Sequence, residues 1–278
     1  MLFRSILIWG IGLSLTWDEF RRVKKNPRVV LIAMLVQLVA VPCLAIFLNW
    51  LFQLPQPLAI GLLLLASMPG GTTANVFSFI SKGNVALNIT LTAINSVLGI
   101  FTVPLMVYLS FLIYQDQGTA IPLQFSKLAQ VLFILIVPML LGMLTRNKFP
   151  KFAVSSEKHI LKFTFFALIL LLIVGVGNEQ ELILNHIAKA GPVVLLLNLG
   201  SLGLAYLTSR YLVLNRADTS ALIMELGIHN CALAIGIGMS PNLLNNITIA
   251  VPAVIYIVLM YLTALPIALW FRRRASPV

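Results

Sequence analysis

The sequence predicts an all-α polytopic membrane protein with nine transmembrane helices, and three observations support this fold class. Of the 278 residues, 60% are hydrophobic and only 10% are charged, with a mean hydropathy of +1.00. Apolar segments of about 20 residues, the length of helix that crosses a bilayer, recur along the chain. Lysines and arginines gather in the joints between these segments, as they do in the loops of membrane proteins. We therefore expect a chain that is embedded in the lipid bilayer.

The apolar segments are separated by joints rich in proline, glycine, asparagine and charge, which are residues that end helices. We expect spanning segments at 2–17, 29–52, 58–81, 84–114, 125–145, 159–178, 190–210, 217–240 and 243–271. The joints include Asn26-Pro27, Gly83-Asn84, Gly191-Pro192 and Ser240-Pro241. Prolines within segments, such as Pro42, are expected to kink helices whose neighbours satisfy the freed carbonyls.

The basic residues predict the orientation of the chain. If the first joint lies in the cytoplasm, 16 of the 19 lysines and arginines are cytoplasmic, and only Arg4, Lys127 and Lys189 face outside. This asymmetry predicts an outside N-terminus and a cytoplasmic C-terminus. It also accounts for the net charge of +11 without a nucleic-acid partner. No transit segment is recognisable, which favours a bacterial inner membrane, although an organellar protein trimmed for expression would look the same.

Two of the segments are predicted to be interrupted helices. Segment 58–81 contains Pro69-Gly70-Gly71, where proline removes a backbone donor and the glycine pair removes backbone restraint. Segment 217–240 contains Met224-Glu225-Leu226-Gly227-Ile228-His229-Asn230-Cys231 at a comparable depth. Two interrupted segments in corresponding halves of a membrane protein indicate a transporter binding site.

The two halves of the chain are predicted to be inverted repeats. The stretches 84–90 and 242–248 both read Asn, three residues, Asn-Ile-Thr, and each opens the segment after an interrupted one. Because an odd number of segments separates the halves, the repeats would face in opposite directions. We place the first repeat at about 1–114 and the second at about 159–272. The helix at about 125–145 is then unmatched, within one membrane domain that covers 1–278.

Glu225 is the one carboxylate placed midway through an apolar segment, where an uncompensated charge costs several kcal/mol or more. Asn75, Asn88 and Thr92 are polar groups in other segments, and Asn88 and Thr92 share one helix face. Carboxylate, amide and hydroxyl oxygens suit a hard, singly charged cation such as sodium, whereas calcium or magnesium would need more carboxylates. For Thr92 or Asn95 alone, hydrogen bonding between helices is an equally good explanation.

His229 follows Glu225 by four residues, and the sequence leaves its role open. A zinc site is not expected, because the other two histidines, His159 and His186, lie near segment ends that we assign to opposite sides of the membrane. Proton handling by Glu225 and His229 is the alternative to sodium binding. No Ser/His/Asp set, His-Glu-x-x-His motif or pair of intramembrane aspartates occurs, so we do not expect an enzyme. The cysteines, Cys43 and Cys231, are expected to be buried as small apolar residues.

From Gly12 onward the chain resembles the bile acid:sodium symporter family. The motifs that support the resemblance are Pro69-Gly70-Gly71-Thr72-Thr73-Ala74-Asn75, Gly83-Asn84-Val85-Ala86-Leu87 and Glu225-Leu226-Gly227-Ile228-His229-Asn230. The resemblance implies a panel domain and a core domain, with two discontinuous helices that cross near the middle of the bilayer. It is closest to the nine-helix members, which lack the first helix.

The resemblance also implies two sodium sites. The first would use Asn75, Asn88, Thr92 and Glu225, with Ala74 where the family often has serine. The second would use Glu225, Gln37, His229 and the backbone carbonyls of Leu226 and Ile228. Because imidazole is a poor sodium ligand, coupling to one sodium ion or to a proton is an open alternative.

The substrate residues implied by the resemblance are Thr72, Thr73, Asn75 and Asn230, together with the free amides of the two half-helices. Such amides carry partial positive charge and favour an anion. Met260 and Tyr261 stand where bile-acid-transporting members often have a His-Asn pair, so the resemblance implies a small organic anion, such as a keto acid or a pantoate-like carboxylate.

We therefore expect a sodium-coupled symporter that imports a small organic anion by alternating access, with no obligate protein partner evident. A proton-coupled or uncoupled carrier is the main alternative, and a membrane receptor or a membrane-embedded enzyme would be the alternative from another class.

Overall fold

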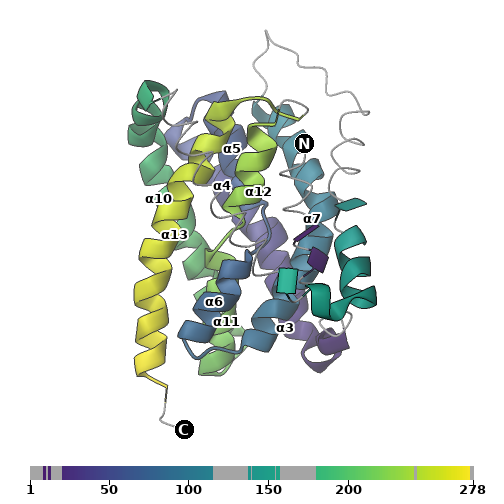
Figure 1. Ribbon diagram of the computed structural model, residues 1–278. Helices are drawn as coiled ribbons and strands as arrows, with labels where there is room; N and C mark the ends of the chain where they lie inside the picture. The colour runs from purple at the N-terminus through teal and green to yellow at the C-terminus, as the bar shows by residue number, and fades with distance from the viewer. Residues whose placement is uncertain are drawn as a thin grey trace.

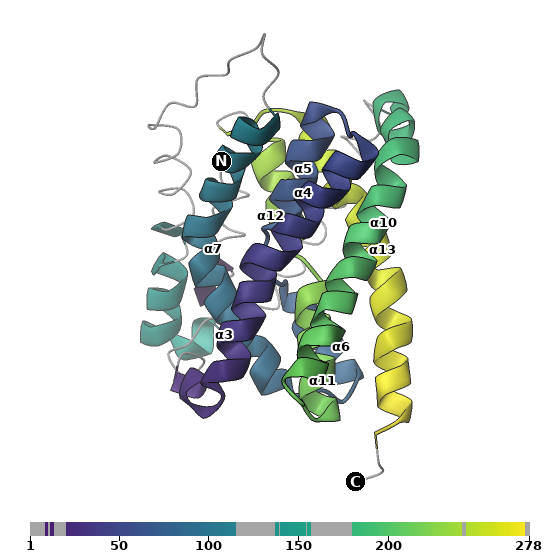
Figure 2. The same cartoon turned by 180° about the vertical axis from the view of Figure 1, so that it is seen from behind.

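The computed structural model describes residues 21–114, 140–153, 155–156, 180–240 and 243–275, with short helical pieces at 9–10, 12–13 and 137–138. The named elements in these ranges are all helical, and they lie side by side as a bundle (Figures 1 and 2). In chain order they are η1 (Val23–Lys25), α3 (Pro27–Leu35), η2 (Val36–Ala40), α4 (Val41–Phe52), α5 (Gln56–Ala66), α6 (Thr72–Ile80), α7 (Val85–Tyr114), α10 (Gln180–Tyr211), α11 (Arg216–Gly227), α12 (Cys231–Gly238) and α13 (Ile247–Arg273).

Continuous helices that are long and apolar enough to cross a bilayer confirm the all-α membrane class. Within the described ranges there are four, at Pro27–Phe52, Val85–Tyr114, His186–Tyr211 and Ile247–Arg273. The predicted segments 159–178, most of 2–17 and most of 125–145 lie outside the described residues. The count of nine helices and the division into panel and core domains therefore stay predictions.

Both predicted interruptions are confirmed. One segment is divided into α5 and α6 by residues 67–71, and the other into α11 and α12 by residues 228–230. Figure 1 shows α5 and α12 in the upper half of the bundle and α6 and α11 in the lower half. The two breaks therefore lie at the same depth, near the middle of the long axis.

The first described span contains a π-helical turn that the sequence analysis did not predict. The turn η2 connects α3 to α4, and Pro42 stands at the start of α4. Proline has no N–H to continue the regular hydrogen-bond ladder, and a wider turn before it accommodates the missing bond. The turn places Gln37 in the interior of the bundle, where it is 1% exposed.

Two predicted boundaries were wrong. The helix α10 begins at Gln180 and passes through Pro192, so Gly191-Pro192 is not a joint. Membrane helices tolerate an internal proline because neighbouring groups satisfy the carbonyl that it leaves free. The helix α13 begins at Ile247 rather than at 243, because the side chain of Asn246 accepts a hydrogen bond from the Thr248 N–H and caps it.

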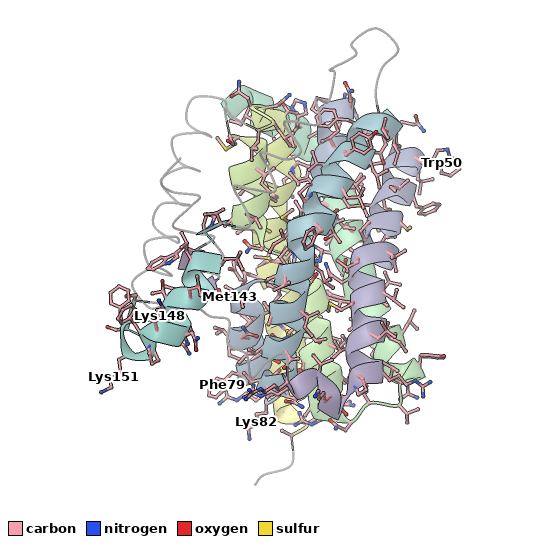
Figure 3. All side chains as sticks on the ribbon, turned by 90° about the vertical axis from the view of Figure 1, so that its right-hand side faces the viewer. Trp50, Phe79, Lys82, Met143, Lys148 and Lys151 are labelled. Carbon is pink, nitrogen blue, oxygen red and sulfur yellow. The ribbon has the colours of Figure 1, made fainter. Side chains whose placement is uncertain are left out.

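Basic residues that follow α6, begin α11 and end α13 lie together at one end of the bundle. Arg216, at the start of α11, donates hydrogen bonds to the carbonyl of Phe271 near the end of α13 and to that of Lys82 after α6. Figure 3 shows Lys82 at one end of the bundle and Trp50 at the other. The clustering agrees with the predicted loop asymmetry, whereas the side of the membrane that this end faces stays a prediction.

Large apolar side chains cover the outside of the bundle. Leu31, Trp50 and Leu262, for example, are 62%, 68% and 64% exposed. Such a surface suits lipid, because hydrocarbon imposes no penalty on apolar side chains. Cys231 is buried as expected, but the expectation was wrong for Cys43, which is exposed on this outer surface.

Gly61 sets the distance between α5 and α13. A Cβ added at Gly61 would lie 2.2 Å from the Ile249 carbonyl oxygen and 3.1 Å from Pro252 Cδ, whereas a Cβ at Gly203 in α10 would meet nothing within 4 Å. We expect Gly61→Ala to destabilise the protein by about 1–3 kcal/mol because two backbones must separate. Gly203→Ala should be neutral or stabilise by up to about 1 kcal/mol. Thermal unfolding in detergent measures both, and equal melting of the two variants would contradict this packing.

Candidate functional site

The backbones of the two interrupted segments pair where they cross. The Asn230 N–H donates to the Pro69 carbonyl at 2.9 Å, and the Gly71 N–H donates to the Ile228 carbonyl at 3.3 Å. Gly70 and His229 consequently form an isolated antiparallel bridge. These bonds satisfy backbone groups that the breaks would leave unpaired inside a membrane. The bridge holds the four half-helix ends together at one point, which we call the crossover.

The crossover brings together helix ends of both polarities. The helices α6 and α12 begin there, so their first amides carry partial positive charge. The helices α5 and α11 end there, so their last carbonyls carry partial negative charge. The same point of the fold therefore offers one environment for an anion and another for a cation.

Amides from neighbouring helices bind the carbonyls that the breaks release. Gln37 Nε2 donates to the Met68 carbonyl at 3.0 Å. Asn198 Nδ2 in α10 donates to the Gly227 carbonyl at 3.2 Å, and the Tyr256 hydroxyl in α13 donates to the same carbonyl at 3.1 Å. Each break is thus held by a side-chain amide from the spanning helix that precedes it.

Polar contacts at one-turn intervals join α7 to α11, and we call them the α7–α11 ladder. Its members are Asn84 Nδ2 to Asp218 Oδ1 at 2.7 Å, Asn88 Nδ2 to the Ala221 carbonyl at 2.8 Å, and the Thr92 hydroxyl to Glu225 Oε2 at 2.5 Å. The ladder begins in the motif 83–87, where the Asn84 N–H also donates to the Ala217 carbonyl. This motif therefore sets the register that brings Thr92 to Glu225.

Glu225 is fully buried beside the crossover. Its Oε2 accepts the Thr92 hydroxyl, while Oε1 has no hydrogen-bond partner among the described residues. The backbone of Gly70 lies directly against the carboxylate, since a Cβ at this position would be 2.3 Å from Oε1. A carboxylate held in this way has one oxygen available for a ligand.

Glu225 Oε1 is one of several buried side-chain oxygens without a hydrogen-bond partner among the described residues. In the part of the chain that the structure describes, they include Gln37 Oε1, Asn75 Oδ1, Asn88 Oδ1 and Glu225 Oε1. An unpaired buried acceptor costs about 1–3 kcal/mol. All four belong to residues predicted as sodium ligands, and a cation is one way to satisfy them. The donor set fits sodium better than zinc, because no group of three His, Cys, Asp or Glu side chains that could hold a metal occurs in the described ranges.

The structure brings together some of the predicted sodium ligands and not others. Asn88, Thr92 and Glu225 share the α7–α11 ladder. Asn75 lies in the first turn of α6, and Gln37 is bound to Met68. Within the described ranges, no hydrogen bond joins either of these two side chains to Glu225.

His229 lies between the C-terminal ends of α5 and α11. Its Nδ1 is 3.1 Å from the Leu65 carbonyl oxygen, and its Nε2 is 3.0 Å from the Leu226 carbonyl oxygen. The ring stacks on that of Tyr256, with 5.2 Å between centroids. Sequence reasoning did not single out Tyr256, because no motif next to it in the sequence distinguishes it from a tyrosine that only packs in an apolar segment.

The predicted substrate residues lie where α6 and α12 begin. Thr72 and Thr73 are partly buried in the first turn of α6. Asn230 is also partly buried, and its Oδ1 accepts the Leu233 N–H at 3.1 Å and caps α12. The side-chain oxygen of Asn230 is thereby used locally, so its contribution to an anion would be the amide Nδ2.

Asn95 is a candidate that sequence reasoning left undecided. It is 1% exposed, and neither of its amide atoms has a partner among the described residues, so hydrogen bonding between helices does not explain it. One turn away on α7, Gly99 faces Pro69, whose Cδ would be 3.7 Å from an added Cβ. Asn95 thus lies between Thr92 and the break at Pro69. The spacing of Asn88, Thr92 and Asn95 on one face was the signal available in the sequence.

The repeated Asn-x-x-x-Asn-Ile-Thr stretches have different roles in the two halves. In the first, Asn84 caps α7 by accepting the Leu87 N–H, and Asn88 is buried one turn inside the helix. In the second, Asn246 itself caps α13. The second asparagine therefore reaches the helix interior only in the first half.

Comparison with known proteins gives a consistent set of relatives. A sequence model of the sodium bile acid symporter family matches residues 1–186. The probable sodium/metabolite cotransporter BASS2, chloroplastic, of Oryza sativa subsp. japonica is 29% identical over 277 residues, which cover 98% of this chain and 64% of the relative. The uncharacterized sodium-dependent transporter YocS of Bacillus subtilis (strain 168) is 27% identical over 234 residues, which cover 84% of this chain and 71% of the relative.

A more distant relative is the hepatic sodium/bile acid cotransporter of Rattus norvegicus. It is 22% identical over 251 residues, which cover 88% of this chain and 68% of the relative. The chain is thus similar to these proteins over most of its own length, and it spans less than two thirds of the rice relative.

Proposed function

The chain belongs to the sodium bile acid symporter family, and we propose that it is a sodium-coupled secondary transporter that imports a small organic anion by alternating access. The names of the rice and Bacillus subtilis relatives, a probable sodium/metabolite cotransporter and a sodium-dependent transporter, support sodium as the coupling ion. The single observation that carries the proposal is the buried Glu225 carboxylate beside the crossover, one oxygen of which lacks a hydrogen-bond partner among the described residues; Asn88, whose side-chain oxygen is also unpaired, lies one turn away on the same ladder.

The sodium ion is proposed to bind among Asn75, Asn88, Thr92 and Glu225. The Thr92 hydroxyl donates to Glu225 Oε2 and keeps its own lone pairs for an ion. Sodium would balance the buried carboxylate charge and satisfy the unpaired amide oxygens. Asn95, with both amide atoms unpaired, is a further polar group on the same face of α7.

The organic anion is proposed to bind at the starts of α6 and α12, where Thr72, Thr73, Asn75 and Asn230 lie and where the helix dipoles place partial positive charge. Asn75 belongs to both proposed sites. An ion bound at its Oδ1 would orient its Nδ2 as a donor to the anion. This would couple the two ligands energetically, and by linkage the anion would strengthen sodium binding equally.

The surroundings of these helix starts favour a small anion such as a keto acid or a pantoate-like carboxylate. Met260 is buried, with its sulfur 3.9 Å from that of Cys231 at the start of α12. The ring of Tyr261 stacks on that of Phe77 in α6, with 5.8 Å between centroids. Met260 and the Tyr261 ring thus offer apolar contacts beside the helix starts, which suits a compact ligand with one anionic group.

Alternating access is proposed to arise from two inverted repeats that exchange conformations. The chain is proposed to lie in a bacterial inner membrane, with its N-terminus outside and its C-terminus in the cytoplasm. The matched amide contacts support internal repeats, since Gln37 binds the end of one break and Asn198 the end of the other. In this scheme the domain that carries the crossover rocks against the other domain.

Thermal unfolding of the purified protein in sodium, potassium and choline chloride, from pH 5.5 to 8, tests the proposal. A ligand that binds only the folded state stabilises it by about 2.7 kcal/mol at 100 times its Kd. We expect sodium, and not potassium or choline, to raise the melting temperature. Stability that follows pH and ignores sodium would reject sodium coupling in favour of a proton-coupled carrier using Glu225 and His229.

Transport itself is tested by uptake of radiolabelled pyruvate and pantoate into proteoliposomes. An inward sodium gradient should drive accumulation, and an equal potassium gradient should not. Sodium-dependent binding without any accumulation would instead indicate a receptor.

A further inference from the structure

The C-terminal ends of two helices meet at the crossover, and the protein must compensate the partial negative charge on their last carbonyls. The helix α5 ends at Ala66 and α11 ends at Gly227, so the last carbonyls of both lie inside the membrane. Half-helix C-terminal ends of this kind are where transporters coordinate cations. Any group placed between them has to supply hydrogen-bond donors or positive charge.

The side chain that lies between these two ends is His229. Its Nδ1 is 3.1 Å from the carbonyl oxygen of Leu65, in the last turn of α5, and its Nε2 is 3.0 Å from that of Leu226, in the last turn of α11. The residue is 1% exposed, and Tyr256 covers one face of its ring. The imidazole therefore fills the space between the two negative ends, with one ring nitrogen near each.

Both ring nitrogens of His229 are directed at carbonyl oxygens of the protein, so neither is directed at a position where an ion could bind. A neutral imidazole carries one N–H and one lone pair, and both ring nitrogens here face carbonyl oxygens. Whichever nitrogen holds the hydrogen, neither is directed at the Glu225 carboxylate. His229 is thus a donor within the protein, and it does not fit the role of a sodium ligand.

The neighbouring carbonyls already accept hydrogen bonds from the protein. The Gly227 oxygen accepts from Asn198 and Tyr256, and the Ile228 oxygen accepts from the Gly71 N–H. In the other break, two residues after α5 ends, the Met68 oxygen accepts from Gln37. Both lone pairs of the Gly227 oxygen are thus in use, whereas the Ile228 and Met68 oxygens each keep one, so it is the His229 ring that leaves no space for a second ion at these carbonyls.

We propose that the His229 ring occupies the position that a second cation would take between the two helix ends, and that the chain binds a single sodium ion, at Glu225, in each transport cycle. This inference rests on the proposed function. It has a consequence for energetics, because one sodium ion moving with a monocarboxylate transfers no net charge. Transport would then follow the sodium gradient and be insensitive to membrane potential, whereas two ions would move one positive charge per cycle.

Equilibrium binding of radioactive sodium to the purified protein tests the proposal by counting ions per chain at saturation. The expected count for the wild type is one. A count of two overturns the inference and leaves the proposed function in place. A count of zero contradicts the proposed function itself, so the two failures are distinguishable.

The variant His229→Gln tests whether the histidine is the cause. Glutamine has a side-chain oxygen that can coordinate sodium, and it removes the ring that fills the space between the helix ends. We expect the count to rise from one to two in this variant. The matched control His186→Gln replaces another histidine, in α10, and should keep a count of one. A count that stays at one in a folded His229→Gln protein overturns the assignment, and if that variant does not fold, the wild-type count still decides.

Discussion

Replacing Glu225 by glutamine is expected to abolish sodium binding while leaving the fold in place. Glutamine has nearly the same volume, and its oxygen can still accept the Thr92 hydroxyl. What is lost is the charge that balances the ion, so we expect the sodium affinity to fall by at least about 100-fold. Thermal unfolding in sodium and in choline chloride measures this loss. In choline the variant should melt at or above the wild type, because a buried, uncompensated carboxylate is costly.

Matched variants show whether the loss belongs to this carboxylate. Asp218→Asn removes an acid from the same helix, at the outer end of the α7–α11 ladder, and should keep the sodium-dependent stabilisation. Thr92→Val removes the hydroxyl that orients Glu225, and should weaken sodium binding by about 10- to 100-fold. Thr102→Val removes a buried hydroxyl without a described partner from the same helix as Thr92, and should have no such effect. An unchanged sodium response in Glu225→Gln would reject the proposed site.

Gly70→Ala is expected to disrupt the crossover although it adds only one methyl group. The new Cβ would lie 2.3, 2.5 and 2.6 Å from Oε1, Cδ and Oε2 of Glu225. The carboxylate is fully buried and bonded to Thr92, so moving it breaks that bond or separates the paired backbones. We expect a destabilisation of about 1–3 kcal/mol, the usual cost of overpacking, together with loss of sodium binding. Thermal unfolding and radioactive sodium binding measure the two effects.

The adjacent glycine is the natural comparison for this prediction. A Cβ at Gly71 would meet Thr73 Oγ1 at 3.3 Å and the Asn230 Cα at 3.9 Å, which small side-chain adjustments can accommodate. Gly71→Ala should therefore change sodium binding far less than Gly70→Ala. If the two alanine variants bind sodium equally well, the carboxylate does not pack against Gly70 as described.

The sequence by itself determined the class of the protein and the depth of its site. In a bilayer every backbone group must be satisfied within the protein, so apolar segments of spanning length can only be helices. Pro69-Gly70-Gly71 predicts a break in one of these helices, because proline removes a backbone donor and the two glycines remove backbone restraint. Glu225 was found because a carboxylate in an apolar segment is costly wherever the helix packs. These conclusions depend on the residues within each segment, and they needed no knowledge of which segments pack against one another.

Only the tertiary structure decided which groups meet. The bond between Thr92 and Glu225 joins residues 133 positions apart, and no local pattern specifies the register of α7 on α11. The structure likewise showed that the His229 ring lies between two carbonyl oxygens, and that Asn95 is buried with no described partner for its amide. A polar side chain in a membrane helix has the same sequence signature whether it binds an ion or a neighbouring helix. The difference lies in what surrounds it, and that is set by packing between distant segments.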